Sequence, residues 1–176
     1  MDDSDARTQQ LVAGLGAEQL NWQPQPGAWS VGQCLEHLCM THEAYLPAIA
    51  AALPGKPVSP VQEITPGWFG RWFMRSFIEP SPATSRTRAP RKIVPGTGPV
   101  DPSILDRFLK STQAIRETLV CAQDLNVNRI RFKNPLIGVI HFTVGTGFQI
   151  LSGHLRRHLL QAERVKDAPG FPGRVS

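Results

Sequence analysis

Apolar residues return at intervals of three and four in four long stretches of the chain, the spacing that places them on one face of a helix. Ser30 precedes the second stretch as an N-cap residue. Asp101 followed by Pro102 is a typical helix start before the third stretch, and Pro169 ends the fourth. The pattern therefore predicts four long helices, over residues 4–19, 30–53, 102–124 and 146–166.

The stretches between these helices are rich in proline and glycine. Prolines exclude a helix across residues 21–27, and Pro47 is expected to kink or split the second helix. Residues 55–100 are the least regular part of the chain, with one short amphipathic segment at 68–77. Residues 129–144 are expected to be extended or irregular.

The composition fits one small globular domain. The chain has 176 residues, of which 41% are hydrophobic and 19% are charged, enough for a buried core. Its 16 prolines and 15 glycines predict long loops. Four long helices with little strand signal favour an all-α fold, a four-helix bundle with long Pro/Gly-rich connections that forms a single domain over residues 1–176.

Membrane and secreted classes are not expected. No stretch has the ~18 consecutive apolar residues of a membrane span, and the acidic start lacks the basic and apolar regions of a signal peptide. The three cysteines, Cys34, Cys39 and Cys121, form no Cys-x-x-Cys pair and are interpreted as small buried hydrophobic residues. We therefore expect a cytoplasmic protein without a membrane partner.

The net charge of +5 is concentrated in the middle of the chain. Six basic residues fall within 22 positions that contain one acidic residue, Glu79. Such a cluster can bind nucleic acid or an acidic ligand, but no nucleic-acid-binding motif accompanies it. We interpret the cluster as a solvated loop region and expect no nucleic-acid partner; its members are Arg71, Arg75, Arg86, Arg88, Arg91 and Lys92.

Two of the five histidines have metal-ligand spacing. His154 and His158 are four residues apart, so on a helix they project from one face. On a helical wheel, His158 lies inside the apolar stripe and His154 at its edge, while Arg156 and Arg157 lie on the opposite, solvent-facing side. Buried imidazoles need partners, which a metal ion or a hydrogen-bonding neighbour would supply. Leu155 occupies the position where a zincin has its glutamate base, so that protease class is excluded.

A third ligand would have to come from another helix, and the second helix offers His37 and His42. The wheel places His42 inside the apolar stripe and His37 outside its edge. Periodicity alone therefore favours His42. Because a helix in a bundle touches two neighbours, its inward arc can be wide enough for both.

Two longer motifs carry a family resemblance. Leu20-Asn21-Trp22, Pro26-Gly27-Ala28-Trp29-Ser30-Val31 and Leu35-Glu36-His37-Leu38 resemble the opening signature of the DinB-like superfamily, and the run from Gly153 to Val165 resembles its closing signature. The resemblance covers nearly the whole chain. It implies a four-helix bundle with a divalent metal ion held by His37, His154 and His158, with His42 no more than a nearby pocket residue.

The implied site would leave coordination positions open for chemistry. Three imidazoles suit Zn, Ni, Cu or Fe, and the sequence does not choose between them. Gln161 and Glu36 are candidates for orienting the ligands. No motif places a carboxylate as a general base, so the catalytic residues are not assigned.

Three classes of function follow from the resemblance. The first is a metal-dependent hydrolase with a small-molecule substrate. The second is a transferase or isomerase that uses a low-molecular-weight thiol of the bacillithiol or mycothiol type, whose anionic groups would meet the basic residues. The third is a non-enzymatic, stress-related binding module. The aromatic residues Trp68, Trp72, Phe73 and Phe77 are expected to pack in the core or a lid, or to line a homodimer surface.

Overall fold

The structure, a computed structural model, describes residues 2–79 and 89–173. It is mostly helical, with one small two-stranded sheet. Five of its helices are α1 (Asp2–Val12), α2 (Ala17–Asn21), α3 (Val31–Ala50), α5 (Ile104–Ala122) and α6 (Val144–Lys166). Shorter elements lie between them: α4 (Trp68–Phe73), the π-helical turn η1 (Met74–Ile78), the 3-10 turn η3 (Arg91–Ile93), β1 (Arg131–Lys133) and β2 (His141–Thr143).

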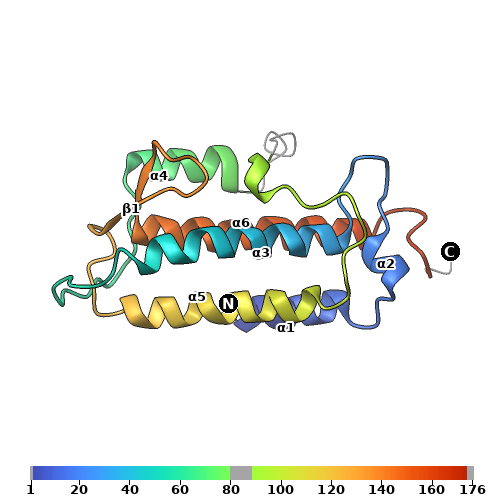
Figure 1. Cartoon of the computed structure of the whole chain (residues 1–176), viewed down its shortest axis with the longest axis horizontal. Helices are drawn as coiled ribbons and strands as arrows, with labels where there is room; N and C mark the ends of the chain where they lie inside the picture. Colours follow the sequence, from blue (N-terminus) through green and yellow to red (C-terminus); the bar gives the residue numbers. More distant parts are fainter. Residues whose placement is uncertain (1, 80–88, 174–176) are drawn as a thin grey trace.

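The long helices pack side by side around α3. Helix α3 contacts both α5 and α6, and α1 contacts the same two helices. Figure 1 shows α3 and α6 running together through the middle, with α5 and α1 on one side and α4 on the other. The core between them contains two apolar clusters, one around Ile49, Phe132 and Phe148 and the other around Leu38 and Phe108.

Helix α3 begins where the sequence predicts. The Ser30 hydroxyl accepts a hydrogen bond from the Gln33 amide at 3.1 Å, and the Gln33 side chain accepts one from the Ser30 amide, which completes a capping box. Pro47 does not split the helix, since α3 continues through this residue to Ala50. Proline has no N–H group, so the carbonyl of Glu43 lacks its usual partner within the helix. Glu43 and Pro47 are both exposed, so water can donate a hydrogen bond to this carbonyl.

The first predicted helix is in fact two. A continuous helix over residues 4–19 is wrong because the chain turns after α1 at Gly14, whose φ of +73° is a left-handed value that glycine adopts without strain. Leu11 before the turn and Leu20 after it are both buried in the same apolar cluster. The turn therefore lets two short helices cover one end of the core.

The last two long helices have the predicted positions with shifted starts. Helix α5 begins at Ile104 because the Asp101 carboxylate accepts from the Ser103 amide at 2.8 Å and holds the preceding residues in a turn. Helix α6 begins at Val144, where the Thr143 hydroxyl accepts from the Thr146 amide at 3.2 Å.

The region 129–144, expected to be extended or irregular, forms an antiparallel hairpin. Phe132 of β1 lies opposite Phe142 of β2, and both side chains are buried. Phe132 also packs tightly on α6, since a Cβ added at Gly147 would lie 2.8 Å from its ring. The hairpin therefore closes one end of the core.

Several side chains differ from their expected exposure. Phe73 is buried, but Trp68, Trp72 and Phe77 are 77%, 51% and 39% exposed, so core packing is wrong for these three residues. A homodimer surface there stays a prediction. Cys34 and Cys39 are buried as expected, whereas Cys121 is exposed. The expected burial is therefore wrong for Cys121, which lies in the last turn of α5.

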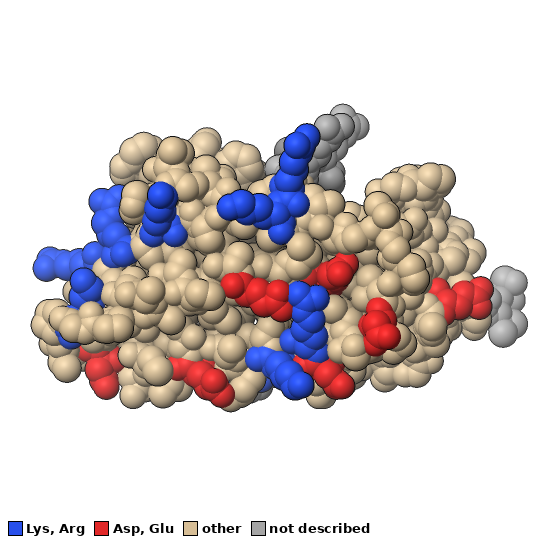
Figure 2. Space-filling view, in the orientation of Figure 1, with Lys and Arg blue, Asp and Glu red and all other residues tan. Residues whose placement is uncertain are grey.

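The basic residues are solvated where the structure describes them. Arg71, Arg75, Arg91 and Lys92 are exposed, while Arg86 and Arg88 lie outside the described residues. Figure 2 shows Lys and Arg side chains spread over one face, with acidic side chains between some of them. None of the helices in the described ranges combines the length and apolar character of a membrane span.

Candidate metal centre

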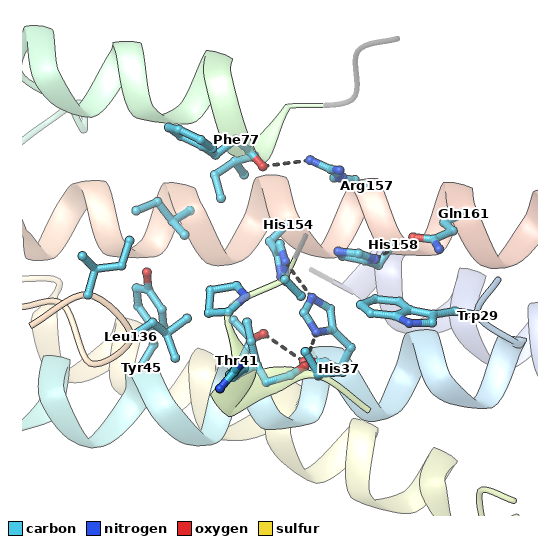
Figure 3. A pocket seen from close by; sticks show the side chains of 18 of the residues that line it. Trp29, His37, Thr41, Tyr45, Phe77, Leu136, His154, Arg157, His158 and Gln161 are labelled. Carbon is cyan, nitrogen blue, oxygen red and sulfur yellow. Dashed lines mark hydrogen bonds between the residues drawn. The ribbon is translucent and has the colours of Figure 1, made fainter. Parts of the chain in front are cut away.

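Three histidines from two helices converge on one point. His37 comes from α3, and His154 and His158 come from neighbouring turns of α6. One ring nitrogen of each lies within 4.8 Å of those of the other two. Figure 3 shows the three rings facing one another between the two helices. The structure therefore brings together the three residues that the family resemblance selected.

The helical wheel misplaced His37 because α3 is buried on two faces. One face packs on α5, and this face carries the apolar stripe with His42. The other faces α6 and the chain around Ile93, and this face carries His37, which is only 1% exposed. His42 is fully buried and is not part of the cavity wall.

Two of the three imidazoles are oriented by hydrogen-bond acceptors. Nδ1 of His37 lies 2.6 Å from the carbonyl oxygen of Ile93, and Nδ1 of His158 lies 2.9 Å from Oε1 of Gln161. Because both partners are acceptors, each Nδ1 carries the proton and each Nε2 keeps its lone pair. This is the usual way in which a protein prepares histidine as a metal ligand. Glu36 has no such role, since its carboxylate accepts from the Gly96 amide.

His154 of α6 lies opposite His37 of α3 and is the third histidine of the cluster. Its Nε2 lies 3.1 Å from Nε2 of His37. Two nitrogens bound to one ion at about 2.0–2.2 Å are separated by roughly 3.0–3.5 Å, so this spacing fits a shared ion. Nδ1 of His154 is buried and has no hydrogen-bond partner among the residues that the structure describes. The donor set therefore fits a divalent metal ion.

Burial keeps all three imidazoles neutral. Desolvation lowers the pKa of His37 and lowers that of His158 to about 3. It also lowers the pKa of His154 well below its usual value, and the neighbouring His158 adds to this effect. Neutral imidazoles have the lone pairs that coordination requires, so no proton has to be removed near neutral pH.

Trp29 covers one side of the histidine cluster. Its ring centroid lies 4.7 Å from that of His37 and 5.7 Å from that of His158, on which it stacks. The ring thus places an apolar surface against two of the three imidazoles. Trp29 directly precedes Ser30, the N-cap residue of α3. The capping box at Ser30 therefore also helps to position the Trp29 ring over the histidines.

The cluster and Trp29 form part of the wall of a large cavity. The cavity has a volume of about 1120 Å³ and is lined mainly by apolar side chains. It follows α3 from His37 past Thr41 to Tyr45 (Figure 3). The Tyr45 hydroxyl accepts a hydrogen bond from Nδ2 of Asn134 at 3.1 Å. The volume is sufficient for a small molecule beside the histidines.

A family model described as the DinB superfamily matches residues 1–162, which is most of the chain. The chain belongs to the DinB superfamily. The searches of curated proteins and of solved structures each found no match. Membership agrees with the resemblance in the two terminal motifs, which lie beside each other in the fold because α3 packs on α6.

Three features of this DinB-superfamily site were missed from the sequence. The Ile93 carbonyl is a main-chain group 56 residues from His37, so no residue type signals it. Arg157 was placed on the solvent side, yet it is half-buried and lines the cavity. Its long side chain bends from the edge of α6 towards Phe77, whose carbonyl accepts from Nη1 at 2.8 Å. Trp29 belongs to the Trp-Ser motif, but the motif does not indicate that its ring packs on His37 and His158.

Proposed function

We propose that His37, His154 and His158 bind one divalent metal ion and that this DinB-superfamily chain is a metal-dependent enzyme with a small-molecule substrate. The observation that supports the proposal most is the convergence of three neutral imidazoles at the wall of a large cavity. We also propose that α1, α3, α5 and α6 form a four-helix bundle in a single domain, since each helix contacts two of the others.

The residues around the site have separate roles in this proposal. The three histidines hold the ion, and Ile93 and Gln161 keep two of the imidazoles in the required tautomer. Trp29 excludes water from one side of the cluster. When bound, a divalent ion supplies Lewis-acid chemistry, since it lowers the pKa of a coordinated water or thiol.

The cavity wall favours thiol-dependent transfer over hydrolysis. No aspartate or glutamate occurs among the described residues that line it. Hydrolysis benefits from a side chain that accepts the proton of the attacking water, and a wall without carboxylates offers none. A bound ion lowers the pKa of either nucleophile, but a free thiol starts from a pKa of about 8.5, far below that of free water, so it depends less on a general base. A low-molecular-weight thiol is therefore the nucleophile that suits this wall best, and hydrolysis is the second candidate.

Metal analysis tests the proposed site. The protein is purified without a metal-affinity tag, loaded separately with Zn²⁺, Ni²⁺ and Fe²⁺, and analysed for bound metal after gel filtration. We expect one ion per chain, and a steep loss of metal in each of H37A, H154A and H158A. The control is H141A, since His141 is an exposed residue of β2. Full metal content in H37A would overturn the proposal.

A second assay separates the candidate reactions. The metal-loaded protein is incubated with a thiol and an electrophilic acceptor, and in parallel with chromogenic esters and amides. Thiol consumption that disappears in H158A supports transfer. Ester or amide cleavage that disappears in H158A supports hydrolysis instead. A metal-loaded protein without either activity would favour the non-enzymatic binding module.

A further inference from the structure

The wall of the cavity carries positive charge and no acidic side chain in its described part. Its charged residues are Arg91, Arg157 and Arg164. The described part of the wall therefore supplies no carboxylate that would balance the charge of a divalent ion. A ligand that enters this cavity therefore meets an environment that favours an anion.

Arg157 shares the cavity wall with the three histidines of the proposed metal site. It follows His154 by three residues and precedes His158 by one on α6. Figure 3 shows its side chain above the rings of His154 and His158. The hydrogen bond to the Phe77 carbonyl holds the side chain over the cavity (Figure 3). A guanidinium oriented in this way matches the geometry of a carboxylate.

The remainder of the cavity suits an apolar molecule. Ile78, Ile150 and Phe73 line it together with the face of α3 that runs from His37 to Tyr45. Eight residues of helix span about 12 Å, so the cavity accommodates a body of one or two rings. The polar groups at its far end are the Tyr45 hydroxyl and the Asn134 amide, which bond to each other.

We infer that the cavity binds an organic anion, a molecule with an apolar body that lies along α3 and a carboxylate or sulfonate that Arg157 holds. The inference rests on the proposed function, because it takes this cavity as the substrate site, and it adds the chemical class of the substrate. Arg157 is then a specificity-determining residue. It selects an anionic ligand and places its charged end beside the histidines.

Two fluorescent probes test the inference. Metal-free protein is titrated with 8-anilinonaphthalene-1-sulfonate and with N-phenyl-1-naphthylamine, which has the same ring systems without the sulfonate. We expect R157Q to weaken binding of the sulfonate about tenfold, the effect of one charge-assisted hydrogen bond, and to leave the neutral probe within about twofold. R157K keeps the charge without the planar pair of donors and should restore only part of the affinity.

The neighbouring residue provides the control. Arg156 is exposed on α6 and lies outside this cavity, so R156Q removes the same charge from the surface and should change neither affinity. The inference would be overturned if R157Q weakened binding of both probes equally, or if R156Q weakened sulfonate binding as much as R157Q does. It would also be overturned if the wild-type protein bound neither probe. Metal analysis of the same preparations tests the proposed metal site separately, since the probe titrations contain no metal.

Discussion

Nε2 of His37 and Nε2 of His154 face each other at 3.1 Å across the contact between α3 and α6, although 117 residues separate them in the chain. Because Nε2 of His37 keeps its lone pair, this contact is a hydrogen bond in which Nε2 of His154 donates. Binding of a metal ion between the rings would require that proton to move to Nδ1 of His154. The same contact joins the two helices that carry the terminal motifs of the family.

Metal binding should stabilise the folded protein, because the three imidazoles meet only when α3 packs on α6. Zn²⁺ at 100 times its dissociation constant should add about 2.7 kcal/mol to the free energy of unfolding. Differential scanning fluorimetry should show a rise in Tm that EDTA reverses. H154A should lose the rise, and H141A should keep it. An equal Tm rise in H154A would show that the metal binds elsewhere.

Gln161 should control the metal affinity without being a ligand. In Q161L the leucine cannot accept the proton of His158 Nδ1, so the tautomer and the ring orientation are no longer fixed. We expect the affinity for Zn²⁺ to fall about 10- to 100-fold, as measured by competition with a chelating dye. Q161E restores an acceptor and should restore affinity. Q113L, on the exposed face of α5, is the matched control and should bind metal like the wild type.

His42 should make the metal-free protein less stable in acid. Its Nδ1 donates to Ser111 at 2.8 Å, and burial lowers its pKa to about 4. Glu43 opposes this shift, and His37 adds to it. Between pH 6.5 and 4 the unfolded chain binds a proton at His42 that the folded chain does not, so the free energy of unfolding falls with pH by about 3 kcal/mol. This loss of stability is absent above about pH 6.5 and complete below about pH 4.

Urea unfolding at several pH values in EDTA tests this expectation. H42Q should lose less stability than the wild type between pH 6.5 and 4, while H141Q should follow the wild type. The other buried histidines contribute to the slope in all three proteins, so the difference isolates His42. Identical slopes for H42Q and the wild type would contradict the assigned cause.

Phe132 should be as important for stability as a residue of a long helix. Its side chain is 4% exposed and packs between Tyr45 and Gly147. F132A should lower the free energy of unfolding by about 3–5 kcal/mol, the cost of a large buried cavity. R131A, whose side chain lies on the exposed face of the same strand, should change it by less than about 0.5 kcal/mol. A small effect of F132A would mean that the hairpin is not part of the core.

The long helices could be predicted because their signals are local. The capping box at Ser30 involves residues three positions apart, and the apolar spacing of α6 repeats within two turns. The hairpin could not be predicted in the same way. Its three-residue strands have little periodicity, and the pairing of Phe132 with Phe142 depends on packing against α6.

The histidines show where periodicity stops being informative. A single wheel assumes one buried face, and it found the pair on α6 and misplaced His37, because α3 packs on α5 and α6 at once. The motif around His37 selected the residue that lies in the histidine cluster, where the apolar spacing favoured His42. The partners of the site, Ile93 and Arg157, depend on the path of distant chain segments and on side-chain direction, which spacing does not encode.

The hydrogen-bond acceptors that orient His37 and His158 differ in how easily a substitution can change them. Any amino acid at position 93 supplies a carbonyl, so the acceptor for His37 survives every substitution that leaves the main chain in place. The acceptor for His158 is a side chain, and a single codon change removes or strengthens it. A library randomised at position 161 should therefore yield variants with a wide range of metal affinities. One randomised at position 93 should yield variants that differ in loop packing and share one affinity.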